Sequence, residues 1–210
     1  MEKSFWHKRW ENNEIAFHDS KPNIFLKKNV NKLLPCNSNR IFLPLCGKTL
    51  DISWLLSKGY SVAGSELSKE AIEQLFIELK IKPSIKKLGN IHCYSAKNID
   101  IFVGDFFELS GGVLGSIDGI YDRASLVALP QVTRQKYSSQ LSKITNYAPQ
   151  LLITYEYNQN LMDGPPFSIT NEEVKTHYNG CYKISLLEKV AVEGGLKGKC
   201  PAFESAWLLT

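Results

Sequence analysis

Blocks of apolar residues along this chain switch between the spacing of strands and the spacing of helices. Residues 41–43 form a short β-type run, and Pro44 ends it because proline has no N–H for a sheet ladder. Apolar residues then recur at helical spacing from Thr49, a typical N-cap residue, to Lys58-Gly59, where a cation and a glycine end the helix. Residues 60–64 form the next apolar run. This order predicts a strand, a helix and a second strand.

The same pattern continues over the rest of the chain. We expect helices at residues 24–34, 70–81 and 133–147, the last two capped by Ser68 and Thr133, and a short helix from Ser168. We expect a hairpin within 89–103, strands at 117–121 and 151–156, a glycine-rich turn at 111–116, and a final strand pair at 182–192 and 202–209. Strands that alternate with helices are typical of an α/β fold, and we expect one domain over residues 1–210.

The first strand–helix–strand unit carries the clearest chemical signal. Cys46-Gly47 supplies a turn after the first strand, and Glu66 follows the second strand, roughly 20 residues beyond that turn, as in nucleoside-binding crossovers. A carboxylate there can accept two hydrogen bonds from a ribose diol. Because Gly47 is the only glycine of the G-x-G-x-x-G pattern, the turn favours a nucleoside without phosphate, such as S-adenosylmethionine.

The same turn contains a misleading tripeptide. Gly47-Lys48-Thr49 looks like the end of a P-loop, but Phe42 stands where the first P-loop glycine is required. Without that glycine the backbone cannot form the nest that holds phosphates. The sequence therefore argues against a nucleotide triphosphatase.

Asp105 and Phe106 follow the predicted strand at 99–103. In a doubly wound sheet, ligands bind outside the carboxyl ends of the strands, which makes this pair a candidate for an adenine pocket. An equally good interpretation is that Asp105 caps a helix and Phe106 belongs to the core. The residues alone do not choose between the two.

Arg123 ends the next predicted strand and interrupts an apolar stretch. An arginine that faces a cleft can bind an anion, and the alternative is a salt bridge with Asp118 or Asp122. The turn-rich loop at residues 163–167 also follows a strand, so we expect it on the same side of the sheet.

Two indoles mark the beginning of the chain. Trp6 and Trp10 lie four residues apart, so they share one face of a helix predicted from Ser4 to Asn13. They could pin this helix to the core, or one of them could cover a cofactor. Large aromatic side chains usually serve burial, which favours the first interpretation.

Charge and composition narrow the classes of partner. The formal net charge is +4, the lysines are scattered, and the densest basic segment, residues 80–87, contains Pro83 and is predicted to be a solvated loop. Five cysteines without a CxxC pair favour reduced thiols and a cytoplasmic location, and four histidines show no metal spacing. No apolar run approaches a signal peptide or membrane span. We therefore expect no metal, nucleic acid or membrane partner.

At this point several motifs together resemble a known family, the thiopurine S-methyltransferases in their short bacterial form. The motifs that carry this resemblance are FWHKRWENNEIAFH at 5–18, FLPLCGKTLDISWLLSKGYSVAGSELS at 42–68, GDFFEL at 104–109, YDRASLVALP at 121–130 and GPPFSI at 164–169. The resemblance covers nearly the whole chain. One departure is Ser65, where relatives usually have an aliphatic residue.

The resemblance implies a class I methyltransferase fold, a Rossmann-like, mainly parallel seven-stranded sheet with helices on both faces. It implies S-adenosyl-L-methionine as methyl donor, bound by Trp10, Leu45, Glu66 and Arg123, beside the candidates Asp105 and Phe106. Trp10 then becomes a cofactor lid within a helical lid segment at residues 1–34, and an indole face near a sulfonium is electrostatically favourable.

The donor also determines the expected chemistry. A sulfonium methyl group is already activated, so a thiolate attacks it in line and the protein mainly aligns the atoms and excludes water. We expect no catalytic base, because aromatic thiols ionise readily and the Arg123 guanidinium, which also approaches substrate in animal relatives, favours the anion. Cys46 is expected to fill space and not to act as a nucleophile.

The expected acceptor is an aromatic or heterocyclic thiol such as a thiopurine, with selenium or tellurium species as further acceptors. The resemblance favours a monomer. Two alternatives stay open from the sequence: a nicotinamide-dependent oxidoreductase, which would need a fuller glycine fingerprint, and a non-enzymatic nucleoside-binding protein.

Overall fold

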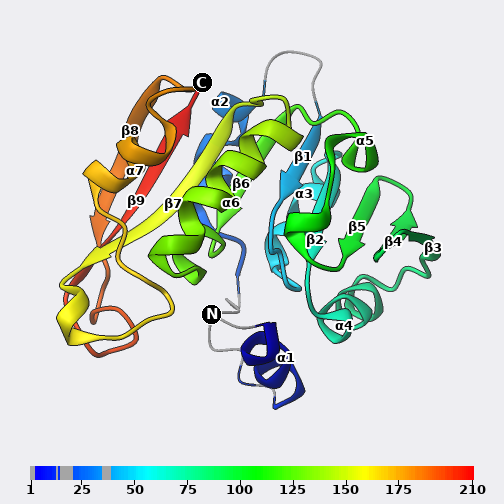
Figure 1. Ribbon diagram of the computed structural model, residues 1–210, viewed down its shortest axis with the longest axis horizontal. Helices are drawn as coiled ribbons and strands as arrows, with labels where there is room; N and C mark the ends of the chain where they lie inside the picture. The colour runs from blue at the N-terminus through cyan, green and yellow to red at the C-terminus, as the bar shows by residue number, and fades with distance from the viewer. Residues whose placement is uncertain (1–2, 13, 15–20, 35–38) are drawn as a thin grey trace.

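One twisted sheet runs through the computed structural model, which describes residues 3–12, 14, 21–34 and 39–210. Within these residues the strands lie in the order β3-β4-β5-β2-β1-β6-β7-β9-β8 (Figure 1). The strands are β1 Arg40–Leu43, β2 Ser61–Glu66, β3 Ser84–Leu88, β4 Ile91–Ala96, β5 Ile99–Val103, β6 Gly119–Arg123, β7 Gln150–Tyr157, β8 Ile184–Ala191 and β9 Ala202–Leu209. The central strands β5, β2, β1, β6 and β7 are parallel, and antiparallel strands flank them on both sides.

The helices alternate with these strands, as predicted. The α-helices are α1 Lys3–Glu11, α2 Ile24–Leu33, α3 Leu50–Ser57, α4 Lys69–Leu79, α5 Gly111–Leu114, α6 Gln131–Ile144 and α7 Asn171–Tyr178. Short 3-10 helices follow three strands: η1 Phe106–Glu108, η2 Leu126–Ala128 and η3 Gln159–Leu161. The expected α/β methyltransferase architecture is therefore confirmed, including the antiparallel hairpin β8–β9 at the end of the chain.

The prediction of seven strands is wrong, because the described residues contain a nine-stranded sheet. Seven consecutive strands, from β5 to β8 in the sheet order, form the expected unit, and β3 and β4 extend its edge. Strand β3 overlaps the lysine-rich segment at 80–87, which the sequence predicts to be a loop. Four of its five residues are exposed, so it carries no alternation of apolar and polar residues for a sequence pattern to detect. Lysines on an exposed edge strand also discourage pairing with other chains.

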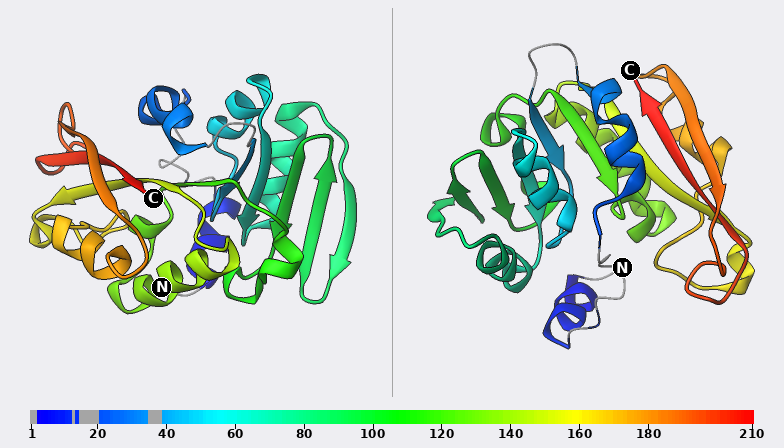
Figure 2. Two further views of the ribbon diagram at one scale, coloured as in Figure 1. Left: turned by 90° about the horizontal axis from the view of Figure 1, so that it is seen from above. Right: turned by 180° about the vertical axis from the view of Figure 1, so that it is seen from behind.

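Alternation along the central strands divides the core between the two faces of the sheet. In β1, Phe42 packs with the residues of α6 and α7, whereas Ile41 and Leu43 pack with those of α2, α3 and α4. Figure 2 shows these two layers of helices on opposite sides of the sheet. Buried strands with apolar residues on both faces explain why the apolar runs of the sequence are nearly continuous.

Local capping chemistry sets most helix starts. Thr49 and Ser68 cap α3 and α4 through their hydroxyl groups, as predicted. Helix α6 instead begins at Gln131, directly after Pro130, so the prediction that Thr133 caps it is wrong. Pro130 is the N-cap residue, with an extended backbone, and no side chain caps this end of α6. The predicted turn at 111–116 contains the short helix α5, which Ser110 caps.

The carboxyl ends of the five parallel strands meet at one edge of the sheet, and α1 lies beyond that edge (Figure 1). Helix α2 packs on β6, β7 and β9 instead, within the apolar core. Residues 15–20 and 35–38, which include Cys36, lie outside the described residues. Among the helices described, none has the length and apolar character needed to cross a bilayer.

A buried carboxylate fixes the end of β6 against α6. Asp122 has no exposed surface; its Oδ2 accepts a hydrogen bond of 2.8 Å from the Tyr137 hydroxyl, and its Oδ1 accepts one from the Leu126 N–H. Burial raises the pKa of Asp122 to about 6, although these donors favour the ionised form. The ionised carboxylate therefore destabilises the folded state at neutral pH.

We predict that Asp122→Asn gains stability over the wild type as the pH rises from about 4 to about 6. The unfolded chain loses this proton near pH 4 and the folded chain near pH 6, so the wild type alone loses up to about 3 kcal/mol in that interval. Urea unfolding at several pH values measures the difference, with the exposed Glu193→Gln as control. A difference that stays constant between pH 4 and 7 would contradict the assignment.

Candidate active site

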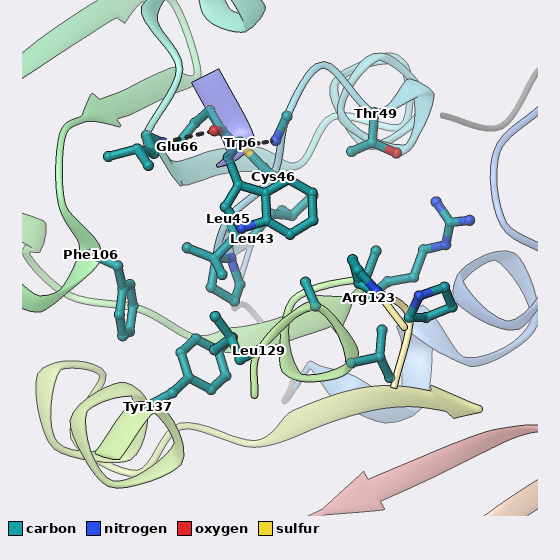
Figure 3. Close-up of a pocket in the computed structure, with 18 of the residues that line it drawn as sticks. Trp6, Leu43, Leu45, Cys46, Thr49, Glu66, Phe106, Arg123, Leu129 and Tyr137 are labelled. Carbon is teal, nitrogen blue, oxygen red and sulfur yellow. Dashed lines mark hydrogen bonds between the residues drawn. The ribbon is translucent and has the colours of Figure 1, made fainter. Parts of the chain in front are cut away.

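A cavity of about 490 Å³ opens at the carboxyl edge of the sheet (Figure 3). Helix α1, the loops that follow β1, β2, β5 and β6, and two loops near the end of the chain form its wall. Its lining includes Trp6, Trp10, Leu45, Gly47, Asp51, Glu66, Asp105, Phe106, Tyr121, Arg123, Tyr137, Pro165 and Lys197. All six residues that the sequence analysis selected as binding candidates therefore line one cavity.

Glu66 joins the turns that follow β1 and β2. One of its carboxylate oxygens accepts a hydrogen bond of 2.7 Å from the Gly47 N–H, and the other accepts bonds of 2.8 Å and 2.9 Å from Leu67 and Ser68. Burial raises the pKa of Glu66, while these three N–H donors oppose the shift by stabilising the carboxylate. A carboxylate has about four acceptor positions, so three are occupied by backbone and about one remains for a ligand.

The turn after β1 has an unusual backbone. Leu45 adopts φ 45°, and its N–H donates to the Ser65 hydroxyl at 3.3 Å, while the Cys46 N–H donates to the Ser65 carbonyl at 2.8 Å. Ser65, the departure from the family pattern, thus supplies an acceptor that an aliphatic residue lacks. A left-handed leucine costs free energy, and these bonds help to hold it in place.

Gly47 follows with φ 53°, and a Cβ atom at this position would lie 3.0 Å from the Trp10 ring. Trp10 is only 5% exposed, so this indole seals the turn. Trp6, from the same helix, extends into the cavity (Figure 3). Both interpretations of the indole pair are therefore compatible with the structure, since Trp10 is packed and also lines the cavity.

The positions of Asp105 and Phe106 are likewise compatible with both interpretations considered for them. The Asp105 carboxylate accepts a hydrogen bond of 2.9 Å from the Phe107 N–H and caps η1, and Asp105 also lines the cavity. Phe106 is 4% exposed, with its ring centroid 5.0 Å from that of Tyr137. The two aromatic rings form one wall of the cavity (Figure 3).

Arg123 approaches the cavity from the end of β6, on another side from Glu66 (Figure 3). The next residue, Ala124, has φ 64°, and the Ser125 hydroxyl donates to the Pro44 carbonyl at 2.6 Å. This bond joins the β6 loop to the β1 loop. Asp118 and Asp122, the alternative partners considered for Arg123, are engaged elsewhere, with backbone N–H groups and with Tyr137.

A buried acid that the sequence pattern does not single out lies beside Arg123. Asp51 is 1% exposed; its Oδ1 accepts a bond of 2.7 Å from the Asn23 N–H, and its Oδ2 accepts one of 3.1 Å from the Tyr121 hydroxyl. Burial raises the pKa of Asp51, and the charge of Arg123 opposes that shift. The only signal in the sequence is an acidic residue in the first turn of an apolar helix, where it is usually explained by the helix dipole.

The cavity offers one buried carboxylate, one guanidinium and several aromatic faces. Cys46 is buried beside Glu66; its pKa is raised well above the usual value by burial and by the Glu66 charge, so the thiol stays protonated. The described residues contain no cluster of three or more potential metal ligands. The volume is typical of sites for small organic ligands.

Comparison with known proteins agrees with this chemistry. Residues 1–201 match the family described as Thiopurine S-methyltransferase (TPMT). The chain belongs to the thiopurine S-methyltransferase family. Over the full 210 residues it is 47% identical to the thiopurine S-methyltransferase of Xanthobacter autotrophicus and 48% identical to that of Teredinibacter turnerae, covering 99% and 98% of those proteins.

Solved structures give the same fold at low sequence identity. A SAM-dependent methyltransferase from Anabaena variabilis has a TM-score of 0.63 and 16% identity, covering 99% of this chain and 95% of that one. The 1,6-didemethyltoxoflavin-N1-methyltransferase of Burkholderia thailandensis has a TM-score of 0.66 and 12% identity, covering 99% and 87%. The prediction of a methyltransferase that uses S-adenosyl-L-methionine is therefore confirmed.

We predict that Gly47→Ala weakens binding of S-adenosylhomocysteine about tenfold, because the added methyl group would lie 3.0 Å from the Trp10 ring and displaces this indole from the cavity wall. Isothermal titration measures the affinity, and Trp fluorescence reports the environment of the indoles. Gly112→Ala is the matched control, since a Cβ there meets nothing within 4 Å. Equal affinities of Gly47→Ala and wild type would show that the turn tolerates the side chain.

Proposed function

We propose that this protein transfers the methyl group of S-adenosyl-L-methionine to the sulfur of an aromatic or heterocyclic thiol, within the cavity at the carboxyl edge of the sheet. The convergence of Trp10, Leu45, Glu66 and Arg123 on one cavity supports this proposal most directly. These residues come from four segments that are far apart in the sequence. The described residues that line the cavity include a carboxylate for the ribose, an indole face for the sulfonium and a guanidinium for the thiolate.

The proposed position of the donor follows from the acceptors and faces in the wall. One ribose hydroxyl donates to the remaining acceptor position of Glu66, and a second hydroxyl can bind only if a backbone N–H releases its oxygen. The adenine ring lies beside Asp105 and Phe106. Leu45 and Trp10 enclose the sulfonium region, where an indole face favours positive charge.

Methyl transfer needs alignment more than proton chemistry. The bound donor supplies an activated methyl group. Helix α1 excludes water by covering the cavity, and the Arg123 guanidinium favours the thiolate form of the acceptor. Cys46 takes no part, because its buried thiol stays protonated beside Glu66. The chain therefore needs no general base for this reaction.

The finer features of the proposal concern the acceptor and the organisation of the chain. We infer that selenium or tellurium species are further acceptors, because their anions are also good nucleophiles toward a sulfonium methyl group. We also propose a cytoplasmic monomer of one domain that has no nucleic acid partner. Within residues 1–34 the lid function belongs to α1, because α2 packs on the sheet.

Two experiments separate this proposal from its rivals. A nicotinamide-dependent oxidoreductase would bind NADH in preference to S-adenosylhomocysteine in a titration. A binding protein without turnover would retain S-adenosylhomocysteine but transfer no labelled methyl group to any thiol or selenol. Labelled product with an aromatic thiol is the expected result.

We predict that Glu66→Gln weakens S-adenosylhomocysteine binding about 10–100-fold. The amide nitrogen cannot accept a hydrogen bond, so either a backbone N–H or a ribose hydroxyl loses its partner, at about 1.5–3 kcal/mol. Titration calorimetry measures this loss. Glu73→Gln, which changes an exposed carboxylate on α4, should bind like wild type. Unchanged affinity in Glu66→Gln would remove Glu66 from the donor site.

We predict that Arg123→Ala lowers kcat/KM for an aromatic thiol about 100-fold, with a much smaller change in Tm. Because the guanidinium favours the thiolate, the rate of the variant should recover as the pH rises above the pKa of the free thiol. Rates over a range of pH test this, with Lys189→Ala on β8 as a control for loss of a surface cation. Equal turnover by Arg123→Ala and wild type would refute the role.

A further inference from the structure

A second, polar hollow adjoins the methyl-donor cavity. It lies between α1, the segment from Asn160 to Pro165, and the loop that joins β8 to β9. Arg9, Pro165 and Lys197 line both spaces, so the hollow opens beside the donor cavity. None of the residues proposed to bind the donor lines it. The hollow is therefore a neighbouring site and not an extension of the donor pocket.

Positive charge dominates this hollow. Arg9, Lys197 and Lys199 line it together with one acidic residue, Asp163. Within the described part of the chain, none of the three cations lies within ion-pair distance of a carboxylate. The Arg9 Nε atom is buried and has no hydrogen-bond partner among the residues that the structure describes. Uncompensated cations of this kind repel one another, and an anion would relieve that repulsion.

Arg9 and Lys197 are held in place by contacts other than ion pairs. The Arg9 guanidinium lies 4.8 Å from the centre of the Phe5 ring and donates weakly to the Glu14 carbonyl at 3.5 Å. The Lys197 ammonium donates to the Pro165 carbonyl at 2.7 Å. These contacts leave further donors on both side chains for a ligand, since arginine carries five N–H groups and lysine three.

The backbone conformation and the charged surroundings of Lys197 also indicate a site for an anion. Lys197 has φ 53°, a left-handed conformation that a non-glycine residue adopts at a cost and that is frequent at ligand sites. Partial burial and the charges of Arg9 and Lys199 lower the pKa of Lys197, so its ammonium form lacks a compensating charge.

We propose that Arg9, Lys197 and Lys199 form a subsite for an anionic oxygen group, such as a carboxylate, carried by the methyl acceptor. This subsite depends on the proposed function, because it requires the methyl acceptor to enter the cavity beside the donor. It makes acidic thiols the favoured substrates, because the carboxylate binds the cations while the sulfur reaches the donor cavity. Charge-assisted hydrogen bonds to these cations provide both affinity and orientation.

Two thiols that differ only in a carboxylate test the subsite: 4-mercaptobenzoate and thiophenol. Each is titrated into the protein saturated with S-adenosylhomocysteine, so binding is measured without turnover. We expect wild type to bind 4-mercaptobenzoate at least about tenfold more tightly than thiophenol, and the double variant Arg9→Gln/Lys197→Gln to lose this preference. Lys175→Gln, which changes an exposed lysine on α7, should keep it.

Three results would overturn the subsite. Equal binding of the two thiols by wild type would show that the cations do not recognise the carboxylate. If the affinities of the double variant for the two thiols fell by the same factor, the substitutions would have a structural effect and the cations would not recognise the carboxylate. Weaker binding of S-adenosylhomocysteine itself by the double variant than by wild type would show that the cations hold the carboxylate of the donor.

Turnover assays with the same two thiols distinguish failure of the subsite from failure of the proposed function. If wild type binds 4-mercaptobenzoate preferentially but methylates neither thiol, the proposed function fails and the subsite stands. If it methylates both with equal KM, the function stands and the subsite fails. The expected result is a lower KM for the acidic thiol in wild type, with this preference lost in the double variant.

Discussion

The hydrogen bonds of the Glu66 carboxylate hold the candidate site together. One side chain at the end of β2 accepts N–H bonds from the turn after β1 and from the start of α4, so two loops are fixed by a single buried charge. Bonds to a charged group contribute about 1.5–3 kcal/mol each, and without them the carboxylate would be buried at a large cost. The position of Gly47, and therefore of the Trp10 indole above it, depends on this arrangement.

Further hydrogen bonds join neighbouring loops along the same edge of the sheet. The Ser125 hydroxyl binds the Pro44 carbonyl, and Ser65 binds the N–H of Leu45, so the loops after β1, β2 and β6 support one another. Leu45 and Ala124 adopt left-handed backbone conformations within these loops. Such strain persists only where surrounding contacts determine the conformation, and it gives the cavity a fixed wall that does not depend on a ligand.

Charge is distributed unevenly around the cavity, and this asymmetry underlies the proposed reaction. Buried acids lie at the end of β2 and beside Arg123, whereas cations gather where α1 meets the last loop of the chain. A donor that carries positive charge and an acceptor that carries negative charge would each meet the opposite sign. Under the proposed function, separate parts of the wall would recognise the two partners and align them, so that the reaction would need no catalytic base.

The sequence by itself determined the alternation of strands and helices, the caps at Thr49 and Ser68, and the position of Glu66 after β2, because these features depend on local spacing. Its motifs also indicated the family. Strand β3 escaped detection because its exposed lysines carry no periodic pattern, and Pro130 replaced Thr133 at the start of α6. Only the tertiary structure decided that Asp51 lies beside Tyr121 and Arg123, and that Arg9 and Lys197 line one hollow. Asp51 is far from β6 in the sequence, and the order of parallel strands brings the loop after β1 next to β6 at one edge of the sheet. Arg9 and Lys197 lie near opposite ends of the chain and come together where α1 meets the β8–β9 loop.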